Sequence, residues 1–203
     1  KKFLKNYIPG YRKVLAIRKK WWGFRFSYFD SIDENLILFR AQSGQSYSGT
    51  PRRIYEYMIA DPKYQNYKFV WLVNNKNDFK FLNSNERTRV YSAGTKKGVR
   101  IFEKAHYVVL NQDLSPYEQI RKKQIVILDP EEYYGVALYL EGEGSEWLAT
   151  KRVFKYADYA LTSNDGMWKD IKKVCHECGN HKVKRMDASL YMLDMINIQP
   201  GEK

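Results

Sequence analysis

Short apolar runs alternate with longer segments of mixed polarity from about residue 35 onward. The clearest runs cover residues 36–39, 69–73, 106–110, 124–128 and 159–162. Runs of this length without regular polar alternation are typical of strands that are buried on both faces. The segments between them carry helical periodicity or turn residues, which indicates βαβ crossovers. We therefore expect a Rossmann-like α/β domain, with a mostly parallel sheet and helices on both faces.

Capping and turn residues place the helices between these strands. Thr50 and Pro51 favour a helix start, and Asp61 followed by Pro62 ends that helix. Gly179 favours the end of a later helix. Further helices are expected at residues 95–105, 147–156, 165–178 and 189–196, and weaker strands at 90–91 and 182–185. Parallel sheets bind ligands beyond the carboxyl ends of their strands, so loops are expected to form the binding edge. These loops are residues 40–50, 74–85, 111–116 and 129–134.

Residues 1–29 form a separate segment with a different pattern. Its apolar residues recur at roughly helical spacing between lysines and arginines, and no acidic residue precedes Asp30. Pro9 and Gly10 are expected to divide it into a short and a longer helix. Residues 30–198 would then be the α/β domain and residues 199–203 a tail.

A basic amphipathic segment with Trp and Phe is typical of helices that lie on an anionic membrane. The residues expected to contact such a membrane are Lys13, Arg18, Lys19, Lys20, Trp21 and Trp22. The alternative is a helix that packs on the domain and leaves its basic face in water.

The net charge of the chain indicates that its partner is anionic. The chain has 35 Lys and Arg against 23 Asp and Glu, a net charge of +12. Such a balance indicates a nucleic acid, an anionic lipid or a phosphate polymer. No nucleic-acid-binding motif is present, so no specific nucleic acid is expected. No run of 18 apolar residues occurs, and two cysteines make no disulfide framework, which favours a cytosolic location.

A cluster of cysteines and histidines near the C-terminus suggests a metal site at first. It consists of Cys175, His176, Cys178 and His181. A structural zinc site needs four converging ligands, whereas this cluster falls at a helix end, where His176 points away from the two thiols. We therefore expect reduced thiols, no bound metal and no cofactor.

The first strand and the segment after it carry the most specific pattern. Residues 39–48 read Phe-Arg-Ala-Gln-Ser-Gly-Gln-Ser-Tyr-Ser, and residues 54–58 read Ile-Tyr-Glu-Tyr-Met. This pattern resembles the first βα unit of the CDP-glycerol:poly(glycerophosphate) glycerophosphotransferases, the teichoic acid polymerase family. Weaker similarity continues at residues 67–71, 110–111, 122–124 and 157–163. The resemblance covers about residues 35–165 and is strongest over 38–73.

Members of this family are two-domain enzymes of the GT-B type, so the resemblance implies the N-terminal, acceptor-side half of a polyol-phosphate or glycosyl transferase for teichoic acid or capsule polymers. A nucleotide-binding domain would be needed in cis or in trans. The implied acceptor is an anionic phosphate polymer or a lipid-linked molecule, at the inner face of a bacterial cell membrane.

The acceptor-binding residues expected from the first loop, the following helix and the strand end are Ser43, Gly44, Tyr47, Ser48, Arg52, Arg53 and Asn111. Small residues before a helix N-terminus favour phosphate, and arginines can pair with it bidentately. The alternative is a polar surface loop with two solvated arginines.

One departure from the family puts catalysis in doubt. The family carries His-Gly-Thr-Pro after the strand that matches residues 124–128, and its histidine is thought to act as the base on the acceptor hydroxyl. Here residues 129–135 read Asp-Pro-Glu-Glu-Tyr-Tyr-Gly, and Glu131 takes the position of the histidine. A carboxylate can act as a base if burial raises its pKa. Two further hypotheses therefore stay open: a non-catalytic acceptor-binding or scaffold domain and, more weakly, a nucleic-acid-binding domain.

Overall fold

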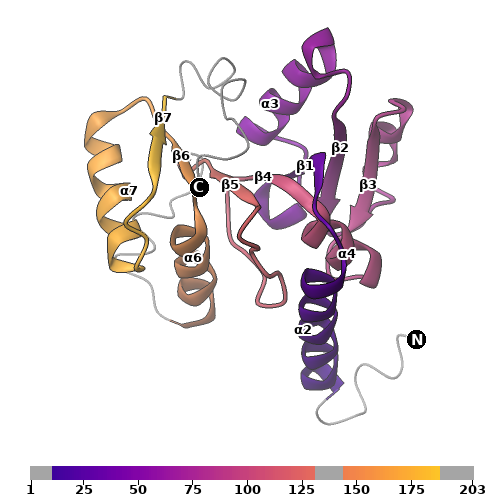
Figure 1. The fold of residues 1–203 in the computed structure, drawn as a ribbon, viewed down its shortest axis with the longest axis horizontal. Helices are drawn as coiled ribbons and strands as arrows, with labels where there is room; N and C mark the ends of the chain where they lie inside the picture. The colour runs from indigo at the N-terminus through magenta and orange to yellow at the C-terminus, as the bar shows by residue number, and fades with distance from the viewer. Residues whose placement is uncertain (1–10, 131–143, 188–203) are drawn as a thin grey trace.

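A computed structural model describes residues 11–130 and 144–187 of the chain (Figure 1). The helices are α2 (Tyr11–Phe29), α3 (Gly49–Ala60), α4 (Lys96–Lys104), α6 (Gly144–Tyr156) and α7 (Asp165–Glu177). The strands are β1 (Asp33–Arg40), β2 (Lys68–Val73), β3 (Thr88–Ser92), β4 (Ala105–Leu110), β5 (Ile125–Leu128), β6 (Tyr159–Leu161) and β7 (Lys184–Met186). Short 3-10 helices are η1 (Gln42–Gly44), η2 (Pro62–Tyr64) and η3 (Lys80–Ser84).

The seven strands form one sheet in the order β3-β2-β1-β4-β5-β6-β7, and every neighbouring pair is parallel. The chain builds outward from β1 to β3, crosses back through α4, and builds outward again from β4 to β7. This confirms the predicted Rossmann-like α/β fold. The direction of strand order reverses between β1 and β4, which is where such folds bind ligands.

Alternate residues of the central strands enter two separate core layers. Leu36 and Leu38 of β1 pack into a layer to which α4, α6 and α7 contribute. Ile37 and Phe39 pack into the opposite layer, which contains Ile54 and other residues of α3. Because successive strand residues point to opposite faces, an apolar run is what a strand covered on both sides requires.

Most predicted elements are present, with shifted ends. The helix expected to open at Pro51 with Thr50 as its N-cap starts two residues earlier, at Gly49, and its N-cap is Ser48. The helix expected at 95–105 is α4, and Thr95 is its N-cap, since its Oγ1 accepts a hydrogen bond from Gly98 N at 3.0 Å. Gly179 follows α7 at a φ of 81°, in the left-handed region. The helix predicted at 189–196 and the short helix before residue 9 lie outside the described residues, and the division at residues 29 and 198 stays a prediction.

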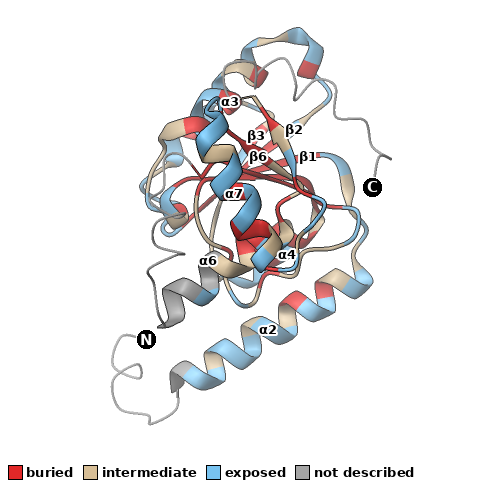
Figure 2. Cartoon of the chain, turned by 90° about the vertical axis from the view of Figure 1, so that its left-hand side faces the viewer, coloured by how far each residue is buried: buried red, intermediate tan, exposed pale blue. Residues whose placement is uncertain are grey.

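Helix α2 packs along α4 and against the loop that follows β4 (Figure 2). Gly23 is the point of closest approach, because a Cβ built there would lie 2.1 Å from the carbonyl oxygen of Tyr117. The ammonium of Lys19 lies 5.0 Å from the centre of the Tyr117 ring. At the end of the helix, Arg100 Nε donates to Asp30 Oδ2 at 2.6 Å. This inner face is therefore held by close packing, a cation–π contact and an ion pair.

Two residues that the sequence assigned to membrane contact belong to this inner side. Lys19 is turned onto Tyr117, and Trp22 is half-buried beneath the guanidinium of Arg18, 5.0 Å from the ring centre. The other four are exposed, namely Lys13, Arg18, Lys20 and Trp21.

The contact at Gly23 predicts the effect of a single methyl group. Gly23→Ala improves helix propensity, yet the new carbon overlaps the Tyr117 carbonyl, so packing of α2 should lose about 1–3 kcal/mol. We expect faster hydrogen exchange across α2 and little change in the sheet. The control is Gly166→Ala, where the added carbon meets only the Asn164 side chain at 3.1 Å and the change should stay below about 1 kcal/mol. Unchanged exchange in Gly23→Ala would contradict the packing argument.

Candidate functional site

The carboxyl ends of β1 and β4 lie next to each other in the centre of the sheet. Their register pairs Arg40 with Leu110, so the loops that follow leave the sheet side by side. These loops contain the residues from Ala41 and from Asn111 onward. Their meeting point is the reversal of strand order, which makes it the candidate ligand-binding edge.

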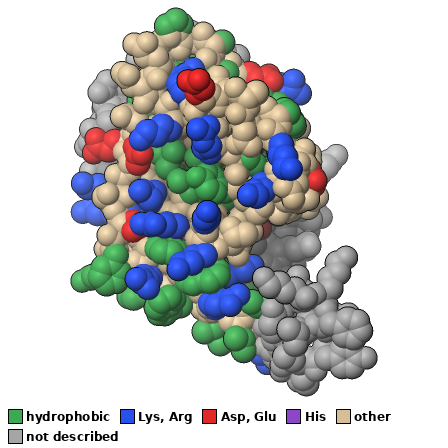
Figure 3. Space-filling model, turned by 90° about the vertical axis from the view of Figure 1, so that its right-hand side faces the viewer, with side chains coloured by type: hydrophobic (Ala, Val, Ile, Leu, Met, Phe, Trp, Pro, Cys, Tyr) green, Lys and Arg blue, Asp and Glu red, His purple; other side chains and the backbone are tan. Residues whose placement is uncertain are grey.

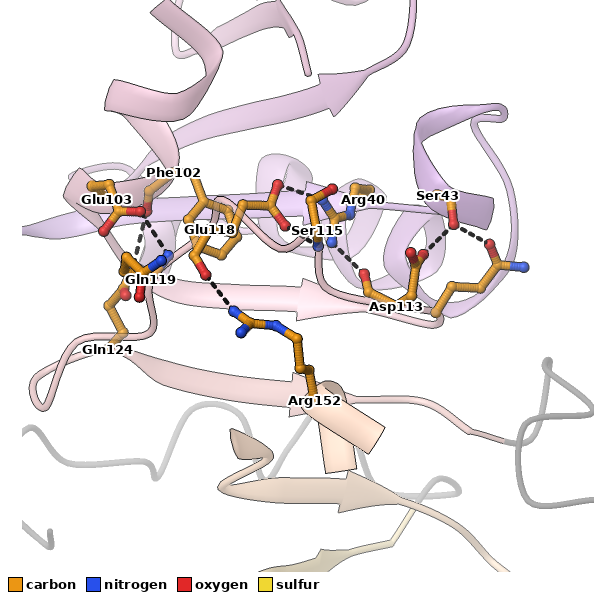
Figure 4. Close-up of polar contacts among 11 residues, drawn as sticks. Arg40, Ser43, Phe102, Glu103, Asp113, Ser115, Glu118, Gln119, Gln124 and Arg152 are labelled. Atoms are coloured by element: carbon orange, nitrogen blue, oxygen red, sulfur yellow. Dashed lines mark hydrogen bonds and ion pairs between the residues drawn. The ribbon is translucent and has the colours of Figure 1, made fainter. Parts of the chain in front are cut away.

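Polar contacts join the two loops. The backbone N–H of Gln42 donates to Asn111 Oδ1 at 2.9 Å. The hydroxyl of Ser43 lies 2.8 Å from Gln112 Oε1 and also hydrogen-bonds the carboxylate of Asp113 (Figure 4). The edge therefore combines a hydroxyl, two amide side chains and a carboxylate, which are groups that recognise hydroxyl-bearing ligands by hydrogen bonds.

The backbone after β1 turns sharply. Gln42, Ser43 and Gly44 all have positive φ, at 44°, 53° and 83°. Gly44 O accepts a hydrogen bond from Asn74 N at 2.7 Å, and a Cβ on Gly44 would lie 3.1 Å from the same nitrogen. The glycine thus lets the loop pack against the end of β2, which is a structural reason for its presence in the motif.

A buried ion pair holds the second loop in place. Arg40, at the end of β1, is 4% exposed, and Glu118 is 1% exposed, with Nη1 and Oε1 separated by 2.7 Å. Arg40 also donates to the carbonyl of Asp113, while Glu118 Oε2 accepts from Ser115 N at 2.8 Å. Arg152 of α6 donates to the carbonyl of Glu118 at 2.7 Å (Figure 4). Both charges are therefore satisfied by specific partners.

An aromatic cluster lies beside the first loop. The ring of Tyr47 packs edge-on against Trp71 and Phe81, with centroids 4.8 and 5.6 Å away. Its hydroxyl donates to Glu56 at 3.0 Å, and Arg52 lies over its ring and pairs with Glu56 at 2.8 Å. Burial and the Glu56 carboxylate raise the pKa of Tyr47. Arg52 is thus already engaged by a carboxylate.

The start of α3 offers a different environment. Ser48 is the N-cap of α3, yet its side chain makes no capping bond and pairs instead with Ser46 Oγ at 2.7 Å. No acidic residue stands in the first turn, and Arg53 is exposed there. A helix N-terminus without an acidic neighbour attracts anions through its free N–H groups and its dipole.

The structure brings some of the predicted residues together and leaves others apart. Ser43 and Asn111 meet at the switch point, whereas Tyr47 and Arg52 form a separate group around Glu56. Glu131 lies outside the described residues, as does most of the predicted loop 129–134, so its role stays a prediction. Four residues at the site were not singled out from the sequence: Gln112, Asp113, Arg40 and Glu118. Of these four, Arg40 could have been recognised in the sequence, because it is a single charge at the end of an apolar run.

The cysteine cluster shows no metal-binding geometry. Over residues 11–130 and 144–187, no three His, Cys, Asp or Glu side chains are grouped as metal ligands. Cys175 and Cys178 are buried free thiols, and burial raises the pKa of Cys175 to about 12. The rings of His176 and His181 lie 4.8 Å apart at the surface end of α7.

Comparison with known proteins decides the family. The sequence profile of the CDP-Glycerol:Poly(glycerophosphate) glycerophosphotransferases matches residues 23–132, more than half of the chain. The chain belongs to this family. The matched segment contains β1 to β5 and both loops of the switch point. No curated protein sequence gives a significant match.

Solved structures of the wall teichoic acid polymerase TagF share the fold. One of them aligns with a TM-score of 0.63 at 16% identity, over 87% of this chain and 44% of that chain. A variant with a histidine replaced by alanine gives 0.62 at 16% identity, over 85% and 43%. A second histidine variant gives 0.58 at 15% identity, over 87% and 44%. The chain therefore spans less than half the length of the TagF chains it matches, and it has the Rossmann-like fold of one half of a GT-B architecture.

No helix within residues 11–130 and 144–187 combines the length and the apolar character that crossing a bilayer requires.

We predict that breaking the Arg40–Glu118 pair lowers the free energy of unfolding strongly. Glu118→Gln leaves the buried guanidinium without a counter-charge and should lower the free energy of unfolding by roughly 3 kcal/mol in urea denaturation. Arg40→Met combined with Glu118→Leu should cost less than the sum of the single changes. The control is Lys68→Gln, which breaks the exposed pair with Asp33 and should cost less than about 1 kcal/mol. Equal costs for the buried and exposed pairs would refute this assignment.

Glu103 of α4 is a second buried carboxyl beneath the same loop. It is 0% exposed, its Oε1 accepts from Gln119 N at 2.8 Å, and its Oε2 has no hydrogen-bond partner in the part of the chain that the structure describes. Burial, with the Glu118 charge adding, raises the pKa of Glu103 from 4.5 to about 8. The folded protein thus keeps this proton up to about pH 8, whereas the unfolded chain releases it near the ordinary value.

The raised pKa of Glu103 determines the direction in which stability changes with pH. The protonated carboxyl contributes stability that is fully present below the unfolded pKa and is lost as pH rises toward the folded pKa of about 8. Between pH 5 and 8, the wild type should lose roughly 3 kcal/mol of unfolding free energy relative to Glu103→Gln. Urea denaturation at several pH values measures the difference. Glu177→Gln, at an exposed carboxyl, should track the wild type at every pH. A pH-independent difference for Glu103→Gln would rule the shift out.

Proposed function

We propose that this chain is the acceptor-side half of a polyol-phosphate transferase in teichoic acid or capsule polymer synthesis. The observation that carries the proposal is the meeting of the β1 and β4 loops at the switch point, within the segment that matches the glycerophosphotransferase family. An α/β sheet of this kind has its ligand-binding crevice at that point. The acceptor is accordingly assigned to the edge formed by Ser43, Asn111 and Asp113.

The chemistry of this edge fits a polyol phosphate. Ser43, Gln112 and Asp113 present hydrogen-bonding oxygens suited to hydroxyl groups. The start of α3, where the Ser48 side chain makes no capping bond and Arg53 is exposed, suits a phosphate. A glycerophosphate or ribitol-phosphate unit carries both kinds of group.

The proposed reaction needs a second domain, in cis or in trans. An acceptor hydroxyl attacks the phosphorus of a CDP-polyol, a new P–O bond forms, the bond to CMP breaks, and a base takes the hydroxyl proton. Glu131 occupies the sequence position of the family histidine and is the candidate base. The domain is expected to act at the inner face of a bacterial membrane.

A scaffold that binds the acceptor without turnover is the second candidate. The departure at residues 129–135 from His-Gly-Thr-Pro favours it. Glu131→Gln, assayed for CMP release together with the nucleotide-binding domain, separates the two. Loss of turnover with acceptor binding retained supports the transferase, whereas absence of turnover in the wild type supports the scaffold.

Acceptor binding is tested on this chain directly. Calorimetric titration with a soluble poly(glycerol phosphate) oligomer should show binding, and Ser43→Ala combined with Arg53→Gln should weaken it at least tenfold. The charge-matched control is Lys123→Gln, an exposed residue just before β5 and so at the opposite edge of the sheet, which should leave affinity within about twofold. An equal loss of affinity in the double variant and in Lys123→Gln would indicate nonspecific attraction to a basic surface. An absence of binding by the wild type would remove the proposal.

A further inference from the structure

The two loops that meet at the switch point contain a single charged residue between them. Residues 41–48 carry no charged side chain, and residues 111–117 carry only Asp113. The chain as a whole has a net charge of +12, and Figure 3 shows lysine and arginine side chains spread over one of its faces. At the point where a sheet of this kind binds its ligand, the loops of this basic protein therefore supply a negative charge and no positive one.

The arginines that flank the first loop in the sequence are both paired with glutamates. Arg40 precedes the loop, is 4% exposed and lies 2.7 Å from Glu118. Its other contact is with the main-chain carbonyl of Asp113 and not with the carboxylate. Arg52 follows the loop and pairs with Glu56 at 2.8 Å. Both guanidinium groups are thus already engaged, which leaves Asp113 as the charge that a ligand meets between the two loops.

The backbone of the first loop holds a hydroxyl against this carboxylate. Gln42 and Ser43 are consecutive residues other than glycine in the left-handed region, with φ of 44° and 53°. Such conformations cost free energy and are concentrated at ligand-binding sites. The N–H of Gln42 is fixed by Asn111 Oδ1 at 2.9 Å, and the Ser43 hydroxyl contacts both Gln112 and the Asp113 carboxylate (Figure 4). The strained backbone therefore serves to place Ser43 beside Asp113.

The hydrogen-bonding capacity of this group of side chains favours hydroxyls over phosphates. An ionised carboxylate accepts hydrogen bonds at about four positions and donates none, and Ser43 has one proton to give. Asp113 and Gln112 are both partly exposed, so a ligand can reach them. A ligand hydroxyl can donate to the carboxylate and accept from the amide N–H groups of Gln112. An ionised phosphate has no proton to donate, and its charge has the same sign as that of Asp113.

We infer that Asp113 makes the switch point selective for the hydroxyl end of an acceptor chain, so that a chain ending in free hydroxyls binds and a chain ending in a phosphate group is rejected. This inference rests on the proposed function, because it assigns one feature of the substrate to the same edge. Hydroxyls on the terminal polyol unit donate to the carboxylate, and the phosphates farther along the chain lie outside this contact. Asp113 is then a specificity-determining residue.

This selectivity is opposite to the one that the charge of the whole protein would produce. A surface with an excess of lysine and arginine attracts more strongly the ligand that carries more negative charge. A terminal phosphate should therefore raise the affinity if the basic surface alone decides binding. It should lower the affinity if the chain end contacts Asp113, because like charges are then brought together. The two possibilities predict opposite orders of affinity.

Calorimetric titration of the full chain with three short glycerol phosphate oligomers tests the inference. The oligomers have equal length and the same blocked group at one end, and they differ at the other end. There, one has a free glycerol diol, one a phosphate monoester and one a diol converted to methyl ethers. The wild type should bind the free diol at least about tenfold more tightly than the other two, because a methyl ether cannot donate and a phosphate is repelled.

Replacing the charge of Asp113 alone should change this preference. Asp113→Asn keeps an oxygen that can accept from Ser43 and leaves the main-chain carbonyl that Arg40 contacts. The preference for the free diol over the phosphate end should fall below about threefold, chiefly through tighter binding of the phosphate end. The control is Asp170→Asn, the same change at an exposed aspartate of α7, which should keep the wild-type preference. A loss of stability would lower all affinities together, so the ratio reports the contact itself.

Three results would overturn the inference. They are binding of the phosphate end by the wild type at least as tight as that of the free diol, an unchanged preference in Asp113→Asn, and equal binding of the free and the methylated diol. Each of them leaves the proposed function in place, because the oligomers still bind. Absence of binding to all three oligomers would remove the proposed function and this inference with it, so the two failures are distinguishable.

Discussion

The ion pair between Arg40 and Glu118 organises the candidate ligand-binding edge of this domain. A guanidinium at the buried end of the central strand β1 is costly to leave without a counter-charge, so the chain must return a carboxylate to it. Glu118 does so from the loop after β4. Once that carboxylate is fixed, the neighbouring carbonyls are fixed too, and they receive Arg40 and Arg152. The position of Asp113 beside Ser43 follows from this arrangement.

The loop after β4 connects the candidate ligand-binding edge with helix α2. Its first residues meet the loop after β1, where we propose that the acceptor binds, and its middle contacts α2 at Gly23. Glu103 holds the loop from below through Gln119. A change that loosens this loop should therefore be felt both at the candidate site and at α2.

The sequence predicts the sheet well because a strand that is buried on both faces needs a continuous run of apolar residues, which is visible locally in the sequence. An apolar run such as residues 69–73 can hardly be anything but a strand between helices. The start of α3 was misplaced by two residues because Ser48 and Thr50 are both acceptable caps, and only the backbone selects between them. The Arg40–Glu118 pair spans 78 positions and has no local signature beyond a charge at a strand end. The family motif located the first loop, but the partners of that loop, Gln112 and Asp113, lie in the loop after β4, a strand that is adjacent to β1 only in space.

Gly23 determines how α2 is rotated about its own axis. Hydrophobicity does not, because apolar side chains occur on both the inner and the outer face. Rotation by one residue, about 100°, would bring Trp22 or Phe24 against the Tyr117 carbonyl, where even a methyl group does not fit. Only one rotation of α2 about its axis, the one that places Gly23 against the Tyr117 carbonyl, allows the helix to pack this closely. A single missing carbon atom therefore decides which set of apolar side chains is enclosed and which is presented to the surroundings.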